Sequence, residues 1–254
     1  MISAERRAIL IQTLNTSGYI EVSNLASQLG VSGITLRRDL EELEQEGLCM
    51  RVRGGAVRRD QGVTLELPYE LKKSQNLSEK RRIGERAAEF VEPGDTIIID
   101  AGSTTYALAT SLITKKRIVV VTNDLYIAVK LAANPDINLV CTGGSVRPNV
   151  FSLQGSQVET FIHGLRVDKT FLGADAIHPD HTISNVNLEE VPIKQAMVHA
   201  AKQVFLLADS TKFQKTGFAK VCDLSEVNKL ITDKGMPRDK IDQYKSLGIE
   251  IVTV

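Results

Sequence analysis

The segment from residue 22 to 48, VSNLASQLGVSGITLRRDLEELEQEGL, constrains the fold of this chain more than any other. Its first half carries apolar residues at the spacing of one buried helical face: Val22, Leu25, Ala26 and Leu29. Gly30 then supplies the left-handed residue that ends such a helix, and Ser32 is placed to cap the next one. The second half repeats a buried stripe, at Leu36, Leu40 and Leu43. Two helices joined by a short turn that contains a glycine predict a helix-turn-helix.

The exposed residues at the start of the second helix indicate what this arrangement binds. Thr35, Arg37 and Arg38 lie off the leucine stripe, in the turns where a recognition helix meets base edges and phosphates. Acidic residues follow later in the helix, where we expect them to point away from a duplex: Glu41, Glu42, Glu44 and Glu46. Arginine pairs also occur on ordinary solvated helices, so a plain helical subdomain is the alternative. The short first helix, the tight turn and the capping serine favour DNA binding.

Two motifs in this region resemble the DeoR family of bacterial transcriptional regulators. They are Arg6-xxx-Leu10-xxx-Leu14 followed by Ser32-xx-Thr35-Leu36-Arg37-Arg38-Asp39-Leu40, and CMRVRGGAV from Cys49 to Val57, which resembles that family's wing, a hairpin ending in Gly-Gly. The resemblance implies a winged helix-turn-helix over residues 1–60, usually in a repressor of a sugar-utilisation operon. The residues expected to contact DNA are Ser32, Thr35, Arg37, Arg38, Arg51 and Arg53. Gly33, a poor helix former, is expected to loosen the first turn of the recognition helix.

Charge distribution matters more here than net charge. The formal net charge of the 254 residues is zero, which by itself argues against a nucleic-acid partner, and the first 60 residues are also neutral. The charges are segregated, however, with arginines at the recognition turn and the wing and acids on the far half of the helix. With 43% hydrophobic residues, the chain is long enough for the DNA module and one sizeable α/β domain.

Cysteine usage and hydropathy indicate the compartment. Cys49, Cys141 and Cys222 are widely spaced and never form CxxC, which excludes a disulfide framework or a cysteine zinc site and fits a reducing cytoplasm. We expect all three to be small buried residues. The amino terminus has no apolar signal core, and no apolar run approaches membrane-spanning length. The sequence therefore predicts a cytoplasmic protein without membrane contact.

The rest of the chain alternates strands with helices. Residues 61–78 mix Pro68 with lysines and polar residues and are expected to be a linker, which leaves residues 79–254 as the second domain. Short Val/Ile/Leu-rich runs predict strands at residues 96–100, 118–121, 138–141, 169–172, 203–207, 229–232 and 248–252. Separated by helical segments, they predict an α/β fold with a mostly parallel sheet and helices on both faces.

Polar loops follow several of these strands, and open parallel sheets bind ligands outside the carboxyl ends of their strands. The loop from Asp100 to Thr105 opens a helix, so Gly102, the hydroxyls and the free N–H groups suit an anion such as phosphate. A capped strand-to-helix turn is the alternative. Other loops at this edge are Thr122-Asn123, Gly143-Gly144, Asp175 and residues 209–212. Between them, Glu190 and Lys194 are four residues apart and fit a surface ion pair on a helix.

The same loops resemble the effector domain of the DeoR family, which is similar to ribose-5-phosphate isomerase and to the sugar-phosphate isomerase and coenzyme A transferase folds. The resemblance implies a phosphorylated sugar or sugar derivative, with phosphate on Ser103 to Thr105, hydroxyls on Asp100, Asp175, Asn187 and Glu190, and positive charge from Lys194 or Lys212. The implied effector-binding residues are Asp100, Gly102, Ser103, Thr104, Thr105, Thr122, Asn123, Gly143, Gly144, Asp175, Asn187, Glu190, Lys194 and Lys212. Because recognition helices normally read palindromic half-sites as dimers, we expect a homo-oligomer, a dimer or a tetramer.

A sugar-phosphate isomerase with an attached DNA-binding module is the alternative function. Isomerisation needs a carboxylate base that moves a proton between adjacent carbons. Isomerases of this resemblance carry Asp-Gly-Ala-Asp and then a glycine-rich turn, whereas here Leu172 precedes Gly173-Ala174-Asp175 and SNVN, residues 184–187, replaces the turn. Our alignment places Lys194 where the catalytic glutamate would be. We therefore expect no enzyme and no catalytic residues.

The histidines do not predict a metal site. His178-Pro179-Asp180-His181 holds two potential ligands and a carboxylate, but its proline and close spacing indicate an exposed turn. His163 and His199 are isolated in the sequence and are expected at the surface or its boundary. We expect neither a metal nor a cofactor.

Overall fold

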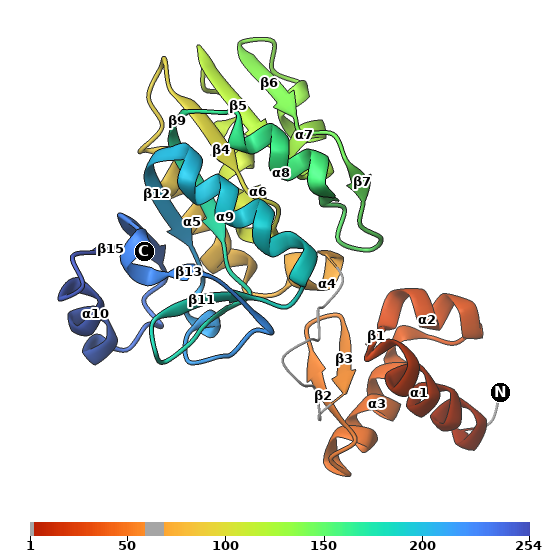
Figure 1. The fold of residues 1–254 in the computed structure, drawn as a ribbon. Coiled ribbons are helices and arrows are strands. Elements are labelled where there is room, and N and C mark those ends of the chain that lie inside the picture. The colour runs from red at the N-terminus through yellow and green to blue at the C-terminus, as the bar shows by residue number, and fades with distance from the viewer. Residues whose placement is uncertain (1–2, 59–68) are drawn as a thin grey trace. The chain divides into compact units, whose positions relative to one another are not determined.

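The computed structural model describes residues 3–58 and 69–254, apart from the side chains of residues 4 and 71, and the chain divides into two compact units, residues 1–75 and 76–254 (Figure 1). Part of the predicted linker, residues 61–78, falls outside the described residues. Its remainder is largely helical, because α4 spans Tyr69–Ser74 and α5 begins at Leu77.

The first unit contains the predicted helix-turn-helix. Its elements are α1 (Ser3–Ser17), β1 (Tyr19–Glu21), α2 (Val22–Leu29), α3 (Gly33–Gln45), β2 (Cys49–Val52), β3 (Gly55–Arg58) and α4. Gly30, which follows α2, has a φ of 64°, and Ser32 Oγ accepts the N–H of Thr35 at 3.1 Å, so both helix-end predictions are confirmed. The apolar faces of α1, α2 and α3 pack together around Leu10, Leu14, Leu36, Leu40 and Leu43.

The wing is an antiparallel hairpin of β2 and β3, and β3 also pairs with β1. The resemblance implied a hairpin that ends in Gly-Gly, but the pair lies at the turn of the hairpin. Gly54 has a φ of 90°, and Gly55 is the first residue of β3. A Cβ at Gly55 would lie 1.8 Å from the carbonyl oxygen of Ile20. Glycine is required there because β3 approaches β1 too closely for a side chain.

The second unit is built on a seven-stranded sheet in the order β15-β14-β12-β9-β4-β5-β6, and every pairing in it is parallel. All the predicted strands are present, with ends within two residues of the prediction. The helices and strands of the large sheet are α5 (Leu77–Ala88), β4 (Thr96–Ile99), α6 (Ser103–Leu112), β5 (Ile118–Thr122), α7 (Leu125–Ala132), β6 (Ile137–Cys141), α8 (Ser156–His163), β9 (Val167–Gly173), α9 (Val191–Ala200), β12 (Ala201–Leu207), β14 (Lys229–Thr232), α10 (Arg238–Lys245) and β15 (Glu250–Thr253).

Smaller elements extend one end of this sheet. They are the hairpin β7 (Ser145–Val146) and β8 (Leu153–Gln154), the antiparallel strands β10 (Ala176–Ile177), β11 (Thr182–Asn185) and β13 (Ala219–Asp223), and the 3-10 turns η1 (Leu188–Glu190), η2 (Ser210–Lys212) and η3 (Leu224–Glu226).

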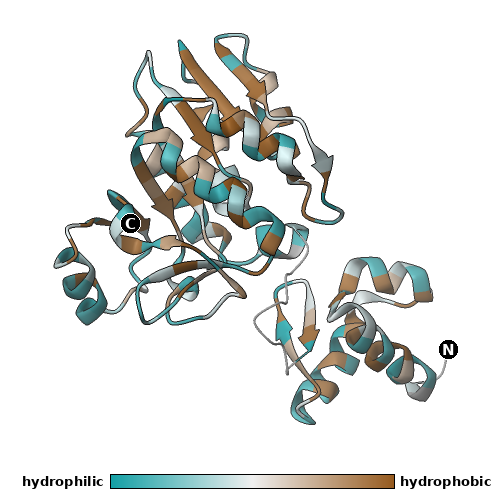
Figure 2. Cartoon of the chain, viewed as in Figure 1, coloured by the Kyte–Doolittle hydropathy of each residue, from teal (hydrophilic) through white to brown (hydrophobic). Residues whose placement is uncertain are grey.

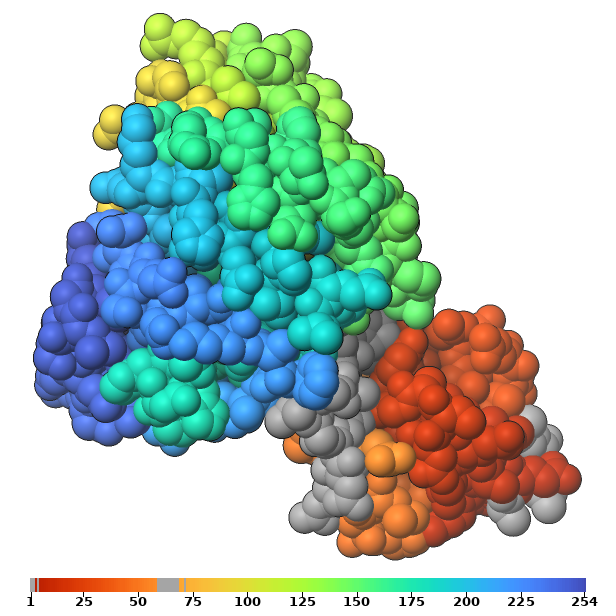
Figure 3. Space-filling model, in the orientation of Figure 1, coloured from red at the N-terminus to blue at the C-terminus, as the bar shows by residue number. Residues whose placement is uncertain are grey.

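Buried apolar side chains lie on both faces of the sheet, as the near-continuous hydrophobic strands predict. Figure 2 shows strands of this sheet in the brown of hydrophobic residues. In β4, Ile97 and Ile99 point to the face that α5, α6 and α7 cover, whereas Ile98 points to the face under α8 and α9. Figure 1 shows α8 and α9 in front of the strands, and in the space-filling view the same segments form part of the face toward the viewer (Figure 3). The centre of the sheet is therefore buried, and the predicted ligand residues lie at or beyond the carboxyl ends of its strands.

The order of the strands reverses between β4 and β9. From β4 the chain adds β5 and β6 on one side, and from β9 it adds β12, β14 and β15 on the other. The loops that leave β4 and β9 consequently diverge to opposite sides of the sheet. In open α/β sheets this divergence produces a crevice at the carboxyl ends of the strands, where ligands bind.

Candidate functional site

The exposed face of α3 carries the arginines that the sequence predicts to contact DNA. Arg37 and Arg38 are exposed, and the leucine stripe is buried on the opposite side of the helix. The side chain of Arg38 is 83% exposed and reaches Glu42 only at 3.8 Å. Such a long, exposed ion pair contributes little, so the Arg38 guanidinium remains accessible to another anion.

The first turn of α3 is held by its cap. Ser32 and Thr35 also share a hydrogen bond between their hydroxyls at 2.8 Å, in addition to the bond from the Thr35 N–H. Ser32 and Thr35, both predicted to contact DNA, thus also cap the amino terminus of α3. This cap holds the first turn, which Gly33 was expected to loosen. The Arg37 guanidinium lies beside Gly33, since a Cβ built there would be 3.6 Å from its Nη1.

Asp39, in the motif RRD, has a structural role. Its carboxylate is buried on α3 and accepts two hydrogen bonds from Arg6 on α1, at 2.6 Å to Nε and 2.9 Å to Nη2. This bidentate geometry adds directional specificity to the ion pair. It fixes α3 against α1, and the sequence alone does not reveal the pairing because the residues are 33 positions apart.

Several acidic residues toward the carboxyl-terminal end of α3 have partners within the first unit, and their orientation toward a duplex stays a prediction. Glu41 lies 3.3 Å from Arg51 of the wing, and Glu44 accepts the backbone N–H of Arg51 at 2.7 Å. Glu46 pairs with Arg7 of α1. The carboxylates therefore hold the wing and α1 against α3, while Arg53 stays exposed at the turn of the wing.

In the second unit, Asp100 and Lys194 form a buried ion pair where the strand order reverses. Asp100 follows β4 and is 1% exposed, and its Oδ2 accepts from the Lys194 ammonium and, at 2.8 Å, from the N–H of Gly173 at the end of β9. Lys194 projects from α9 and also donates to the Gly173 carbonyl oxygen at 3.3 Å. The pair thus joins β4, β9 and α9 at the predicted ligand edge.

Lys194 does not form the surface ion pair with Glu190 that their spacing suggested. Both side chains are buried, and their hydrogen-bond partners differ: Asp100 for Lys194, and Ser152 and Asn185 for Glu190. Burial alone would lower the pKa of Lys194, but Asp100, Glu190 and Asp175 together raise it. The ammonium is therefore charged at neutral pH, and burial conversely raises the pKa of Asp100.

Glu190 is the centre of a second polar cluster, most of which sequence reasoning missed. Its carboxylate accepts from the Ser152 hydroxyl at 2.5 Å and from the Asn185 amide at 3.0 Å, and lies 3.3 Å from Arg147. Burial would raise the pKa of Glu190, but Lys194 and these partners lower it. The sequence signal that could have indicated this cluster is Arg147, which follows shortly after Gly143-Gly144.

The amino terminus of α6 has the features of an anion site. Its N-cap is Gly102, which has no side chain to accept the first N–H groups of the helix, and Ala101, Gly102 and Ser103 are partly exposed. By contrast, Thr104 and Thr105 are buried, and Thr105 Oγ1 donates to the Gly102 carbonyl oxygen at 2.8 Å. Backbone N–H groups and Ser103 are thus the donors that an anion would meet.

Asp124 supports this loop, although the sequence analysis did not select it. The fully buried carboxylate caps α7 through the N–H of Ile127 at 3.0 Å and accepts the N–H of Gly102 at 3.1 Å. Burial raises the pKa of Asp124 to about 6, against the stabilising backbone hydrogen bonds. An aspartate directly before a predicted helix is a capping signal that would have identified it.

The other predicted ligand residues mostly serve the architecture of the loops. Thr122 Oγ1 donates to the Ile99 carbonyl oxygen, and Asn123 accepts from Ala101 N–H and donates to the Leu153 carbonyl oxygen. Asn187 caps η1. Asp175 accepts the N–H of Val186 at 3.2 Å, and Gly144 has a φ of 111° in the turn before β7. Gly143 lies in the loop after β6, and Lys212 is the last residue of η2, which follows β12. Their roles toward a ligand stay predictions.

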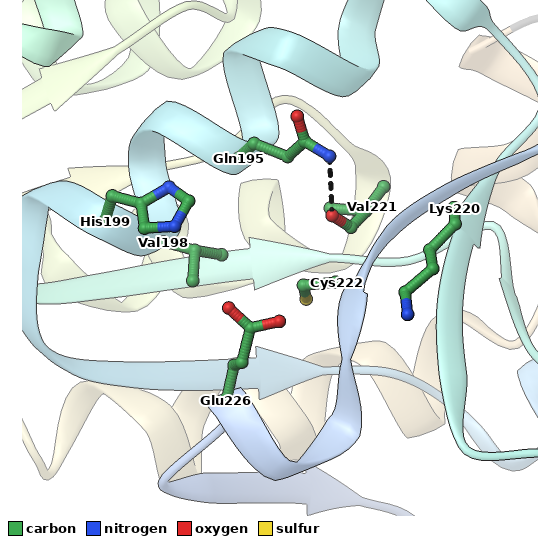
Figure 4. Close-up of a pocket in the computed structure, with 7 residues that line it drawn as sticks. All are labelled: Gln195, Val198, His199, Lys220, Val221, Cys222 and Glu226. Carbon is green, nitrogen blue, oxygen red and sulfur yellow. Dashed lines mark hydrogen bonds between the residues drawn. The ribbon is translucent and has the colours of Figure 1, made fainter.

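A pocket of about 400 Å³ lies away from this edge, between α9 and β13 (Figure 4). Its apolar floor includes Val198, Val221 and Cys222, and none of the predicted ligand residues lines it. Three of its polar side chains have partners within the protein: Gln195 donates to the Val221 carbonyl oxygen, Lys220 donates to Asp223, and Glu226 accepts the N–H of Asp223. We therefore place the candidate site at the sheet edge and not here.

The histidines and cysteines add no metal cluster. Among the described residues, no group of three or more His, Cys, Asp or Glu side chains could hold a metal ion. His178 and His181 lie in the turn between β10 and β11, as predicted, and His178 Nδ1 is 2.8 Å from Asp180. All three cysteines are free thiols, but Cys141 is exposed, contrary to expectation. None of the helices in the described part of the chain is long and apolar enough to span a bilayer.

Comparison with known families covers nearly the whole chain. Residues 6–62 match the DeoR-like helix-turn-helix domain, and residues 75–234 match the DeoR C terminal sensor domain.

Curated proteins of similar length match from end to end. The HTH-type transcriptional regulator GlpR of Haloferax volcanii is 34% identical over 252 residues, 99% of this chain and 98% of that protein. The glycerol-3-phosphate regulon repressor of Escherichia coli K12 is 30% identical over 237 residues, 93% of each chain. Among solved structures, ribose 5-phosphate isomerase A of Methanocaldococcus jannaschii covers 56% of each chain at 17% identity, with a TM-score of 0.42.

Proposed function

The chain belongs to the DeoR family of transcriptional regulators, and we propose that it represses a sugar-utilisation operon under the control of a phosphorylated sugar or sugar derivative bound by residues 76–254. The observation that carries the effector half of this proposal is the place where β4 and β9 end. There, an uncapped helix terminus, a buried ammonium and several carboxylates meet at the reversal of the strand order.

On the DNA side, α3 enters the major groove and the wing contacts the backbone. The exposed arginines Arg37 and Arg38 stand on the face of α3 opposite the leucine stripe, which suits a recognition helix. Ser32 and Thr35 lie at its amino terminus, closest to the groove. Arg53 at the exposed turn and Arg51 beside Glu41 are placed in the wing to neutralise phosphates.

On the effector side, phosphate binds at the start of α6. The N–H groups after Gly102 and the Ser103 hydroxyl are its donors, and the helix dipole favours the negative charge. Asp100, Asp175, Asn187 and Glu190 lie at the same edge and accept hydrogen bonds from sugar hydroxyls, while Lys194 and Lys212 supply positive charge. The Asp100–Lys194 pair also holds the ends of β4 and β9 at a set separation, which preorganises the site.

Effector binding changes the affinity for DNA only if the ligand prefers one arrangement of the protein. We propose a homo-oligomer, a dimer or tetramer, whose helix-turn-helix units span two half-sites of a palindromic operator. Near-complete release from DNA then needs a preference of about 5 kcal/mol for the arrangement that does not bind.

The same edge is poorly suited to isomerase chemistry. A general base needs a carboxylate oxygen that is free to take a proton from the substrate. Asp100 is instead 1% exposed, with its Oδ2 held by Lys194 and Gly173. Both oxygens of Glu190 have partners, Oε1 in Ser152 and Arg147 and Oε2 in Asn185. The arrangement favours holding a sugar phosphate over transforming it.

The test uses the full-length protein and two matched double variants. A thermal-shift screen of phosphorylated sugars finds a stabilising compound, because a ligand that binds the native state raises its stability with occupancy. That compound is then titrated against a fluorescent operator selected from random duplexes. Asp100→Asn/Lys194→Ala is expected to keep operator binding and lose the response to the compound.

The control is Asp168→Asn/Lys202→Ala, which removes an exposed pair of the same unit at 2.8 Å. It is expected to respond like the wild type. A response retained by the Asp100/Lys194 variant would refute the assigned effector site, and failure to select any operator would refute the regulator itself.

A further inference from the structure

Ile34, the second residue of the recognition helix α3, is 77% exposed, the largest exposed fraction among the large hydrophobic side chains in the described ranges. Single exposed apolar residues are common and need no explanation by themselves. This one is notable for its position, because the first turn of a recognition helix is the part that reaches base edges.

The neighbours of Ile34 share its face. Arg37 and Arg38 follow it by three and four residues, which places the three side chains together on the exposed side of α3. The buried stripe occupies the opposite side, so Ile34 has no role in the core of the unit. An isoleucine flanked by two accessible arginines forms an apolar spot inside a basic surface.

The local backbone keeps this spot rigid and open. The cap formed by Ser32 and Thr35 fixes the first turn, and a β-branched side chain loses little freedom when it is bound. Gly33, directly before Ile34, has no side chain, and the Arg37 guanidinium lies against it. Because Gly33 has no side chain, Ile34 is the first residue of α3 to present one on the exposed face.

We propose that Ile34 reads a thymine in each operator half-site through contact with the thymine 5-methyl group. That methyl is the apolar feature of the major-groove edges, and it distinguishes A·T from the other base pairs. Arg37 and Arg38 meanwhile contact phosphates or guanine. This inference rests on the proposed DNA-binding role of α3 and adds the base that the helix specifies.

The contact has a measurable size. Burying one methyl group against an aliphatic side chain is worth about fourfold in affinity. Replacing that thymine by uracil, which lacks only the methyl, is therefore expected to weaken operator binding by the wild-type protein about fourfold. Uracil at the other positions is expected to have a smaller effect.

The experiment combines the protein and the DNA changes. An operator is first selected from random duplexes with the full-length protein, and each thymine is then replaced by uracil, singly and in both half-sites together. Ile34→Ala removes the contact in both half-sites, so it is expected to weaken binding to the thymine operator about as much as uracil in both half-sites weakens binding by the wild type. It is expected to show no further loss on either uracil operator. Val129→Ala removes a 75% exposed apolar side chain on α7 and is expected to match the wild type throughout.

Each result decides between the alternatives. If Ile34→Ala and the wild type show the same uracil sensitivity at every position, Ile34 does not contact a thymine methyl. The same holds if Ile34→Ala weakens specific and random duplexes equally, since a base contact affects the specific site. If the wild type selects no operator, the proposed DNA-binding function fails as well.

Discussion

Replacing Lys194 by methionine tests the central assignment in the second unit. Methionine keeps the length and apolar stem of the side chain but removes the ammonium. Asp100, which is 1% exposed, then retains the Gly173 N–H as its donor at 2.8 Å and loses the opposite charge. Removing one partner of a buried ion pair typically costs about 3–5 kcal/mol, because the remaining charge is uncompensated.

Protonation of Asp100 limits this cost at low pH. Burial already raises the pKa of Asp100 in the wild type, and the loss of Lys194 raises it further. Between the unfolded pKa of about 3.9 and the raised native pKa, the native state binds one more proton than the unfolded state. The wild type and Lys194→Met both lose stability as the pH rises through this window, but in Lys194→Met the window extends to a higher native pKa. Between the two native pKa values, the stability of Lys194→Met therefore falls relative to the wild type by about 1.4 kcal/mol per pH unit. The deficit is expected to be smaller at pH 5 than at pH 8.

Urea unfolding at both pH values measures the deficit. The two units need not unfold together, so amide exchange on peptides from β4 and β9 is used to follow the second unit separately. Lys202→Met, which removes an exposed partner of Asp168, serves as the control and is expected to change stability little at either pH. Asp100→Asn added to Lys194→Met is expected to restore most of the loss.

Two results would refute the reasoning. One is an equal loss for Lys194→Met and Lys202→Met, which would mean that the buried pair contributes no more than an exposed one. The other is a deficit that neither depends on pH nor responds to Asp100→Asn, because the uncompensated carboxylate would then not be its cause.

Three further predictions concern individual side chains. Arg38→Ala is expected to weaken operator binding at least tenfold and to leave sugar-phosphate binding unchanged, since a phosphate or guanine contact is worth about 1–3 kcal/mol; unchanged mobility shifts would contradict the assigned recognition helix. Asp124 has a native pKa of about 6, above its unfolded value, so its contribution to stability is present below about pH 4 and lost as the pH rises through 6. Asp124→Asn is expected to flatten the stability profile between pH 4 and 7 in urea titrations, and an unaltered profile would assign that dependence elsewhere. Arg6→Ala is expected to lower the melting temperature of the first unit more than Arg7→Ala, because Arg6 holds the buried Asp39 and Arg7 an exposed Glu46; equal shifts would argue against the α1–α3 clamp.

Local patterns in the sequence were sufficient for the helix-turn-helix and for the strands. The cap at Ser32 and the left-handed Gly30 depend on neighbours within a few residues, so both can be predicted from the local sequence. The parallel strands are likewise marked by short apolar runs, because both of their faces are buried.

The partners of buried charges were not predictable in the same way. Asp100 and Lys194 are 94 residues apart, and Glu190 is 38 residues from Ser152, so no periodicity connects them. The spacing of Glu190 and Lys194 suggested neighbours on one helix, but Glu190 ends η1 and Lys194 lies in α9, and each has other hydrogen-bond partners. Long-range pairing depends on strand order, which local propensity does not determine.

The bond between Arg6 and Asp39 has a consequence for how such a regulator is switched off. Because two hydrogen bonds between Arg6 and Asp39 join α1 to α3, tilting the recognition helix alone would break this largely buried ion pair. In the proposed oligomer, we therefore expect the effector to move each helix-turn-helix unit as a rigid body. The distance between the units would change, and their internal structure would not.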